Sequence, residues 1–579
     1  MALQLRVKNW QSYIPIVPAL TRYRREDFSH DLVAGVVLGV ITVPQAIAYA
    51  FLAGLPAEAG LYASLVPMVL YAVFGSSKHL VVGPVAITAL MVAAAVGQYA
   101  PLYGQTYLGV TTVLCLQAGI FLWLLRLSQM GGLVNLLSHP VITGFVNAAA
   151  LLIIISQLPA FTGIGRGEAT EPFEQLLHLA RGLDQLNPAV VSVGAACLVA
   201  LYLVRRYSVP LLRLFLRDVE DNHPIRRTGP MLVAAFAALA VTIWNLDGDL
   251  GVAVVGPLPS GLPAFTLPPF HWQMWLDVAP VSAMIAVVSY VESYSIGTTL
   301  ATRERTRVNS HQELIALGAA NIGAAFTGAY PVSGSFSRSS VNYQTGARTQ
   351  VSALVCMAVI VLTLLYFTPL FERLPHAALA AIVVVSVVSI VDVHSMRRHW
   401  RIHREDSITE IATLLTVLAF GVETGLITGV ALSIAFFVRT SSRPHIVIVG
   451  RIPHTEHFRS ARRYDVETFP QVAAIRVDEN IYFGNANQVE SKLLKVVQRR
   501  PGTRHVLLVM SAVNMVDVSG LEMLIRLNLN LEAMGIKLHL SEVKGPVMEQ
   551  LEATDFTLRL TGSVFFTTDQ AMRDLAERS

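Results

Sequence analysis

Charged residues are scarce in this sequence of 579 residues. They make up 14% of the chain, whereas soluble domains usually carry about 25%. Hydrophobic residues make up 53%, and the mean hydropathy is +0.54. A chain this long and this poor in charge cannot bury its apolar surface in one water-soluble core, so a bilayer must solvate much of it. The net charge is only +4, and the basic residues are spread over many loops. The chain therefore lacks the dense basic face of a nucleic-acid binder, and we expect no nucleic-acid partner.

Cysteine is nearly absent. The three cysteines, Cys115, Cys197 and Cys356, lie far apart inside apolar stretches and lack CxxC spacing. We therefore expect no disulfide framework and no zinc site, and the simplest interpretation is three small buried side chains. The sequence also lacks a P-loop, a metal-ligand cluster and any nucleophile–base spacing. These absences argue against an enzyme, and we expect no metal and no cofactor.

A removable signal peptide is missing as well. Five basic residues precede the first long apolar stretch, which has no small-residue cleavage pattern and is followed by many more. Stretches of spanning length recur from about residue 30 to about residue 440. Fourteen are candidate membrane spans, near 31–51, 60–75, 85–98, 107–126, 133–157, 187–206, 229–245, 279–301, 311–327, 335–346, 350–370, 376–392, 407–421 and 424–439. The third and the tenth are too short or too polar to be ordinary spans.

Basic residues indicate the orientation of the spans. If the N-terminus is cytoplasmic, every loop after an even-numbered span is cytoplasmic too. Those loops contain Lys78, Arg126, Arg205, Arg206, Arg213, Arg217, Arg226, Arg227, Arg303, Arg305, Arg307, Arg348, Arg397, Arg398, Arg401 and Arg404. The opposite loops contain only Arg166, Arg181 and Arg373. Because the asymmetry keeps its phase throughout, it predicts fourteen spans with both termini in the cytoplasm, in the cell (inner) membrane.

The composition changes after the last span. Beyond about Val472 the periodicity alternates between strands and amphipathic helices. The predicted strands and helices are 473–478, 485–500, 506–510, 519–535, 536–543 and 545–555. This order predicts a small α/β domain on the arginine-rich, cytoplasmic side of the membrane.

Two segments break the rules for ordinary spans at matching places in the two halves of the chain. VVGPVAITAL contains Gly83 and Pro84, and AYPVSGSFSRSSVN contains Pro331 and a run of serines. Proline forces the preceding residue to be extended, so each segment is predicted to be a short extended piece followed by a half-helix. Such paired segments indicate a transporter built from two inverted repeats, here seven spans plus seven. The two half-helix N-termini would then face one another near the midplane.

Two helix N-termini facing a dry cavity would bind an anion, because each presents unpaired N–H groups and roughly half a positive charge. Ser335 and Ser337 add hydroxyl donors there, and the guanidinium of Arg338 suits an oxyanion. The alternative is a flexible loop whose Arg338 reaches a membrane interface. In the first span, Gln45 and Tyr49 share one helix face. They either face the anion or hydrogen-bond a neighbouring helix.

Glu292, about halfway along the eighth span, is the second intramembrane charge. A carboxylate there is costly and is functional by default. The alternative is a structural ion pair with Arg338, and both interpretations can hold at once. The other acidic residues of the membrane region lie near span ends and are expected to be ordinary: Asp31, Glu58, Glu410 and Glu423.

Four segments, in order along nearly the whole chain, resemble the SulP family of anion transporters. They are residues 31–64, 83–89 and 313–342, and VDVSGLEML at 516–524, which is similar to the STAS domain of anti-sigma-factor antagonists. The resemblance implies an α-helical polytopic membrane protein with fourteen spans in a 7+7 inverted repeat, and a C-terminal cytoplasmic α/β STAS domain. It also implies a core domain of spans 1–4 and 8–11 and a gate domain of spans 5–7 and 12–14. The expected parts are an N-terminal segment, a transmembrane transport domain, a linker and the STAS domain, at 1–29, 30–440, 441–470 and 471–579.

The resemblance further implies an anion held between half-helices 3 and 10, with contacts from span 1. The substrate-binding residues are then Gln45, Tyr49, Val85, Ala86, Ser335, Phe336, Ser337 and Arg338. Transport would follow an elevator-like movement of the core against the gate. The implied partners are a small inorganic anion, the lipid bilayer, a second copy of the chain and an unidentified cytoplasmic partner of the STAS domain.

Two positions bear on the substrate and the coupling ion. In proton-coupled sulfate members a glutamate precedes a glycine by five residues, and half-helix 10 has the sequence GSFSRSAVN. In this chain Glu292 precedes Gly297 by five residues, and residues 334–342 have the sequence GSFSRSSVN. In sodium-coupled bicarbonate members a hydroxyl residue follows an aspartate by one turn, whereas this chain has Ile296, a poor sodium ligand. We therefore predict proton-coupled sulfate uptake. A bicarbonate or C4-dicarboxylate symporter, an anion channel or exchanger, and an anion-sensing receptor are the alternatives.

Glu292 is the predicted coupling residue. When charged, its carboxylate would pair with Arg338 and weaken the anion site. Protonation from the outside would free Arg338, so that a dianion binds and neither ion crosses alone.

Ser519, two residues after Asp517 at a strand-to-helix turn, is the candidate regulatory site of the STAS domain. Antagonist relatives are phosphorylated on a serine at this position, and a helix N-terminus favours phosphate. The simpler alternative is that Ser519 caps the helix.

Overall fold

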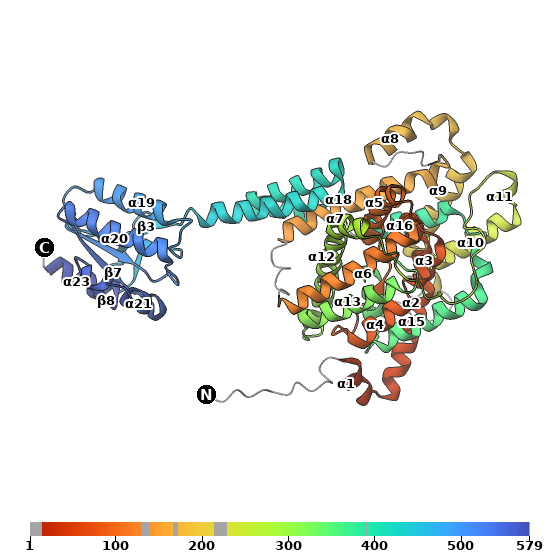
Figure 1. Cartoon of the computed structure of the whole chain (residues 1–579), viewed down its shortest axis with the longest axis horizontal. Helices are drawn as coiled ribbons and strands as arrows, with labels where there is room; N and C mark the ends of the chain where they lie inside the picture. The colour runs from red at the N-terminus through yellow and green to blue at the C-terminus, as the bar shows by residue number, and fades with distance from the viewer. Residues whose placement is uncertain (1–13, 130–137, 166–171, 214–227, 389–390, 578–579) are drawn as a thin grey trace. The chain divides into compact units, whose positions relative to one another are not determined.

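The computed structural model of the chain describes residues 14–129, 138–165, 172–213, 228–388 and 391–577. They form two compact units, Met1–Ala431 and Leu432–Ser579. The first unit is helical, and the second contains a β-sheet with helices on it (Figure 1). Some sequence predictions concern residues outside these ranges, namely 1–13, 133–137, 389–390, 578–579, Arg166, Arg217, Arg226 and Arg227.

The first half of the membrane unit follows the predicted order of spans. Its elements are α1 (Ile16–Thr21), α2 (Arg25–Leu52), α3 (Ala57–Tyr62), α4 (Val66–Phe74), β1 (Val82–Gly83), α5 (Ala86–Tyr103), α6 (Tyr107–Leu127), α7 (His139–Thr162), α8 (Pro172–Arg181), η3 (Leu183–Gln185), α9 (Pro188–Arg213), α10 (Gly229–Ile243) and α11 (Leu246–Asp249). The chain before α5 is extended, as predicted, but the third span is longer than predicted: α5 is itself long and apolar enough to cross a membrane.

The second half repeats this plan. Its elements are α12 (Trp272–Arg303), α13 (Ser310–Ala325), β2 (Ser333–Gly334), α14 (Phe336–Gln344), α15 (Val351–Leu362), the π-helical turn η5 (Thr363–Phe367), η6 (Thr368–Phe371), α16 (His376–Val388), α17 (Val393–Ile402) and α18 (Arg404–Ser441). As in the first half, a short strand, β2, precedes the half-helix α14.

The described helices account for all fourteen predicted spans. Ten helical segments are long and apolar enough to cross a membrane. The helices α10, α13 and α14 are shorter, and α18 breaks at Gly421 into two spans. Gly421 has a φ of +85°, which glycine adopts without steric cost, and it lies where the thirteenth predicted span ends. The fold is therefore that of a helical polytopic membrane protein whose two halves follow the same plan.

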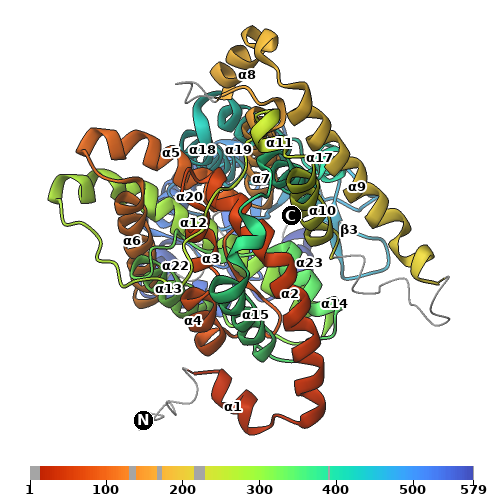
Figure 2. The ribbon, with the colours of Figure 1, turned by 90° about the vertical axis from the view of Figure 1, so that its right-hand side faces the viewer.

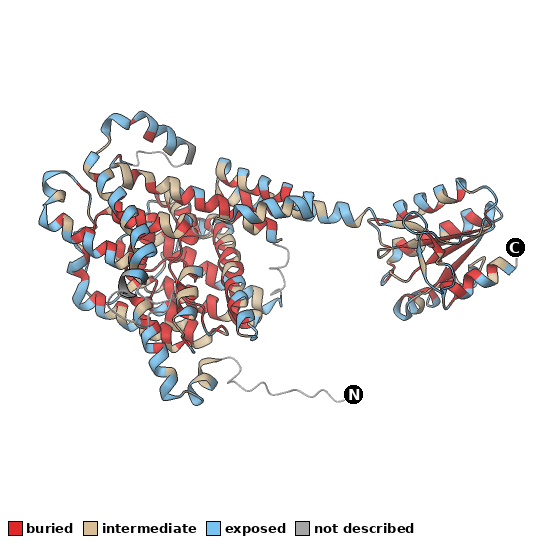
Figure 3. Ribbon diagram, turned by 180° about the vertical axis from the view of Figure 1, so that it is seen from behind, coloured by how far each residue is buried: buried red, intermediate tan, exposed pale blue. Residues whose placement is uncertain are grey.

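Helices that are far apart in the sequence pack side by side in this unit. The helix α2 lies against α15, and α6 lies against α13 (Figures 1 and 2). Buried residues are concentrated inside the unit (Figure 3). Large apolar side chains such as Phe236, 68% exposed, and Phe420, 73% exposed, lie at its periphery, as expected where lipid is the solvent.

A close backbone contact supports the first span. A Cβ atom on Gly60 of α3 would come within 1.9 Å of the carbonyl oxygen of Ala46 on α2. Only glycine allows α3 to approach α2 this closely, and small residues commonly serve this purpose between membrane helices. The contact lies beside Gln45, so it also fixes the part of α2 that carries a predicted site residue.

The second unit is built on a six-stranded sheet in the order β4-β3-β5-β6-β7-β8. Its elements are β3 (Ile446–Arg451), β4 (Phe458–Ser460), β5 (Val472–Val477), α19 (Ala486–Gln498), β6 (His505–Val509), α20 (Val518–Ala533), β7 (Lys537–Ser541), α21 (Gly545–Glu552), α22 (Phe556–Arg559), β8 (Val564–Phe565) and α23 (Thr568–Glu577). The strands β5 to β8 run parallel. The helices α19, α20 and α21 pack with Ile475 on one face, and α23 packs with Ala474 on the other. The predicted α/β domain is therefore confirmed.

The predicted linker at 441–470 is wrong as a description of this segment. It contains β3 and β4, and β3 pairs antiparallel with β5 in a register that aligns Ile448 with Ile475. The β-branched residues of β3 favour a strand. Its partner β5 becomes a neighbour only in the folded sheet, so the sequence pattern did not identify the pairing.

We predict that Gly60→Ala destabilises the membrane unit by about 1–3 kcal/mol, because the added methyl group forces α3 away from α2. The melting temperature of the purified full-length protein measures this effect. Gly97→Ala is the matched control, because a Cβ atom there meets nothing within 4 Å. Equal melting temperatures for the two variants would contradict the tight contact at Gly60.

Candidate functional site

The two half-helices are held together by the pairing of β1 with β2. The strands are antiparallel and align Val82 with Gly334 and Gly83 with Ser333. The backbone N–H of Ser335 donates to the carbonyl of Val81 over 3.0 Å and extends this pairing. Because α5 and α14 begin directly after the paired segments, their N-termini lie at the same place. The predicted pair of facing half-helices is therefore present in the structure.

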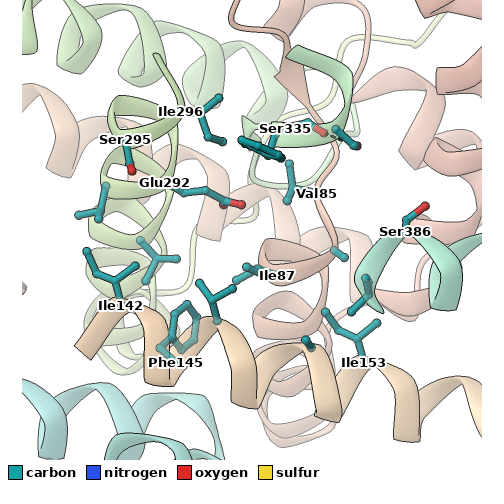
Figure 4. A pocket seen from close by; sticks show the side chains of 18 of the residues that line it. Val85, Ile87, Ile142, Phe145, Ile153, Glu292, Ser295, Ile296, Ser335 and Ser386 are labelled. Atoms are coloured by element: carbon teal, nitrogen blue, oxygen red, sulfur yellow. Dashed lines mark hydrogen bonds between the residues drawn. The ribbon is translucent and has the colours of Figure 1, made fainter. Parts of the chain in front are cut away.

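Both helix N-termini open onto one pocket of about 260 Å³ (Figure 4). Val85, the residue before α5, makes no side-chain capping bond, so the first-turn N–H groups of α5 are left for another acceptor. The residue before α14 is Ser335, whose hydroxyl accepts weakly from the N–H of Arg338 over 3.5 Å. The pocket wall includes six of the predicted substrate-binding residues: Tyr49, Val85, Ala86, Ser335, Phe336 and Ser337.

Glu292 of α12 also lines this pocket, and its side chain points toward the pocket centre (Figure 4). Its Oε2 accepts a hydrogen bond from the Ser333 hydroxyl over 3.1 Å. The next residue, Ser293, accepts from the backbone N–H of Gly334 over 2.7 Å. The carboxylate is thus tied through Ser333 to β2, and neighbouring bonds tie α12 to the start of the second half-helix.

The predicted ion pair between Glu292 and Arg338 is wrong for this structure. Arg338 is 1% exposed and does not line the pocket. Its Nη2 donates to the carbonyl of Pro84 over 2.6 Å, and its Nη1 lies 3.1 Å from where a Cβ of Gly83 would be. The guanidinium therefore lies behind the wall of the pocket, against the segment before α5. It can act on a bound anion through its charge, because arginine stays protonated in proteins.

Of the two residues predicted on the first span, Tyr49 and Gln45, one lines the pocket and the other supports a residue of its wall. Tyr49 lines the pocket, whereas the buried Gln45 donates from Nε2 to the hydroxyl of Ser386 over 3.3 Å. Ser386, on α16, is itself part of the pocket wall. Sequence reasoning missed both Ser386 and Ser333. Ser333 lies in β2, at the start of the serine run that leads into the second half-helix, but Ser386 lies in an ordinary apolar helix and carries no sequence signal.

The acidic residues expected to be ordinary include two that are buried. Asp31 is 0% exposed and accepts from the backbone N–H of Arg348 over 2.7 Å. Glu410 is 1% exposed and lies 2.9 Å from Nδ1 of His399. Sequence reasoning did not single out Glu313, which is 0% exposed and accepts from the phenol of Tyr71 over 2.7 Å. These carboxylates hold helices together and do not line the pocket.

In the second unit, the capping role predicted for Ser519 is wrong. The residue before α20 is Asp517, and its Oδ1 accepts the backbone N–H of Gly520 over 2.8 Å. Its Oδ2 also accepts the N–H of Phe483 over 2.9 Å. Ser519 is the second residue of α20, and its side chain is half-buried.

The fold and the pocket define a polytopic membrane protein with a pocket at the N-termini of two half-helices. The model of the Sulfate permease family matches residues 28–413, and that of the STAS domain matches residues 463–575. The chain belongs to the sulfate permease family, a family of anion transporters, and its second unit contains a STAS domain.

Curated relatives resemble the chain over most of its length. "Probable sulfate transporter 4.2" of Arabidopsis thaliana is 34% identical over 534 residues, covering 90% of this chain and 77% of the relative. "Probable sulfate transporter Rv1739c" of Mycobacterium tuberculosis is 30% identical over 574 residues and covers 98% of each chain.

Solved structures share the fold. The murine Slc26a9 anion transporter in the inward-facing state has a TM-score of 0.90 at 23% identity, covering 100% of this chain and 96% of that one. The transmembrane domain of the cyanobacterium bicarbonate transporter BicA has a TM-score of 0.59 at 21% identity, covering 70% of this chain and 98% of that one.

We predict that Asp517→Ala destabilises α20 by about 0.5–2 kcal/mol, because it removes the side chain that caps this helix. Hydrogen–deuterium exchange of the full-length protein measures this as faster exchange in the first turn of α20. Ser519→Ala is the control, and its effect should stay within about 0.5 kcal/mol. A larger effect of Ser519→Ala than of Asp517→Ala would restore the original capping prediction.

Proposed function

We propose that this chain takes up sulfate across the cell (inner) membrane, coupled to protons, by an elevator-type alternating-access mechanism. The observation that carries the proposal is the pocket that combines two helix N-termini with one half-buried carboxylate, Glu292. The N-termini suit a small oxyanion. The carboxylate supplies a group that can gain and lose one proton. Relatives named as sulfate transporters support sulfate as the anion.

The distribution of polar groups around the pocket supports an elevator. The half-helix N-termini, Ser335, Ser337 and Glu292 all belong to the predicted core. The opposite wall, from α7, is apolar and includes Ile142, Phe145, Val146, Ala150 and Ile153 (Figure 4). A site whose polar partners lie almost entirely on one body can move with that body along a smooth apolar surface. The hydroxyl of Ser386 is the polar exception.

Proton coupling follows from the charges at the pocket. A charged Glu292 repels an anion at the half-helix N-termini, and this repulsion is strong where water is scarce. Protonation removes that negative charge, while the fixed charge of Arg338 behind the wall remains. A dianion then binds, and release of the proton on the other side promotes its release. In this scheme the switch is the charge of the Glu292 side chain, and no ion pair between Glu292 and Arg338 has to form or break.

Other predictions extend the proposal. The phase of the basic residues supports cytoplasmic termini, and thus a cytoplasmic STAS domain. The homodimer, the STAS partner and phosphorylation of Ser519 stay predictions. Crosslinking in native membranes tests the dimer, and phosphopeptide mass spectrometry tests Ser519.

We expect radiolabelled sulfate to accumulate in proteoliposomes only when an inward proton gradient is imposed. Unlabelled sulfate should suppress the uptake, whereas bicarbonate, fumarate and chloride should not. The measurement is initial uptake with and without the gradient, with a protonophore as control. An absence of sulfate flux would leave the fold intact and assign the site to bicarbonate or a dicarboxylate.

We expect Glu292→Gln to abolish accumulation against the gradient while preserving sulfate exchange. Glutamine can still accept a hydrogen bond from Ser333, but it cannot carry a proton across the membrane. The ratio of internal to external sulfate should fall to about one, since a carrier without coupling only equilibrates its substrate. Glu58→Gln, near a span end, is the matched control and should accumulate sulfate normally. Uphill accumulation by Glu292→Gln would refute proton coupling through this residue.

A further inference from the structure

A polar hollow of about 450 Å³ lies entirely within the second unit. Three arginines line it, Arg459, Arg463 and Arg476, together with His445 and Asp478. Three guanidinium groups at one hollow are an unusual concentration of positive charge for a unit of this size. The transport pocket uses none of these residues, and the arrangement requires its own explanation.

The hollow is built by the segment that the sequence pattern assigned to a linker. The hairpin of β3 and β4 aligns Val449 with Ser460 at the edge of the sheet. The carbonyl of Ser460 then accepts the N–H groups of Arg463 over 3.0 Å and of Tyr464 over 3.1 Å, which curls the chain into one tight turn. This turn keeps Arg459 and Arg463 at the same hollow, so the two side chains are positioned by backbone structure.

The charges at the hollow do not balance. Arg476 donates from Nε to Oδ1 of Asp478 over 2.5 Å, and Nδ1 of His445 lies 2.9 Å from Oδ2. Burial acts to raise the pKa of the Asp478 carboxyl, but the hydrogen bonds from Arg476 and His445 outweigh it and hold the pKa below its ordinary value. Asp478 therefore compensates Arg476. Arg459 and Arg463 form no ion pair within the described part of the chain, so two positive charges are left uncompensated.

We propose that this hollow binds a phosphate-bearing anion, either a soluble phosphorylated molecule or the headgroup of an anionic lipid. Guanidinium groups bind phosphate oxygens in bidentate fashion. Two uncompensated charges match the roughly −1.5 to −2 charge of a phosphate monoester near neutral pH. A hollow of about 450 Å³ is also large for a bare inorganic ion and is in the range of small-molecule sites.

Both sources of phosphate are consistent with the position of the hollow in the chain. Its first residue, His445, comes four residues after Ser441, the end of α18. Four residues span at most about 14 Å, so the hollow is near the end of the last membrane helix. Basic groups close to a membrane helix attract anionic headgroups. The open rim, with Tyr464 54% exposed, equally admits a soluble ligand.

The test uses the detergent-solubilised full-length chain and two probes. Pyrophosphate binding is measured by isothermal titration calorimetry. Binding of dioctanoyl phosphatidic acid is measured by native mass spectrometry, with dioctanoyl phosphatidylcholine, a zwitterion of zero net charge, as the comparison. The test variant is Arg459→Ala/Arg463→Ala. The matched control is Arg462→Ala/Arg499→Ala, which removes the same charge from exposed positions outside the lining.

We expect the test variant to weaken binding of at least one probe by about tenfold or more, and the control to change it by less than about twofold. Pyrophosphate binding alone assigns a soluble ligand, and phosphatidic acid binding alone assigns a lipid. Arg459→Lys/Arg463→Lys keeps the charge and the fold but loses the guanidinium fork, and it should show an intermediate affinity. Equal losses in the test and control variants, or no binding of either probe to the unaltered chain, would overturn the proposal.

Discussion

The membrane unit depends on one short antiparallel pairing, in which β1 aligns Val82 with Gly334 of β2. Each strand is followed at once by a half-helix, so this pairing decides where both positive helix ends lie. Side chains reinforce it: Ser293 accepts from the backbone of β2, and Arg338 donates to the carbonyl of Pro84. These bonds satisfy extended backbone within a membrane region that offers no water to do so.

Arg338 and Glu292 lie in different environments because the structure keeps them apart. The guanidinium is fully buried against the backbone before α5 and stays charged. The carboxylate lines the pocket and is held by the hydroxyl of Ser333. A direct salt bridge would fix the carboxylate in its ionised form. The hydrogen-bond partner of Glu292 is instead the neutral hydroxyl of Ser333, which does not fix its charge in this way.

The sheet of the second unit begins earlier in the chain than the repeating strand–helix pattern indicates, because β3 and β4 also belong to it. The hairpin of β3 and β4 extends the parallel strands with an antiparallel edge. The chain between α18 and this hairpin is held firmly: Tyr482 donates to the hydroxyl of Ser441, and Lys492 donates to the carbonyl of Pro444. A ligand at the hollow beside His445 would therefore act where the chain leaves its last membrane helix.

The sequence by itself determined the spans, the two half-helices and the α/β domain, because apolar stretches, proline positions and strand–helix periodicity act locally. It also singled out Glu292, since a charge within a span is conspicuous. Only the tertiary structure decided that Arg338 faces the backbone of β1, that Ser386 completes the pocket and that β3 joins the sheet. The physical reason is the same in each case: the partner lies far away in the sequence, for example 254 residues for Arg338 and Pro84. No local pattern records which distant group a side chain or a strand will meet.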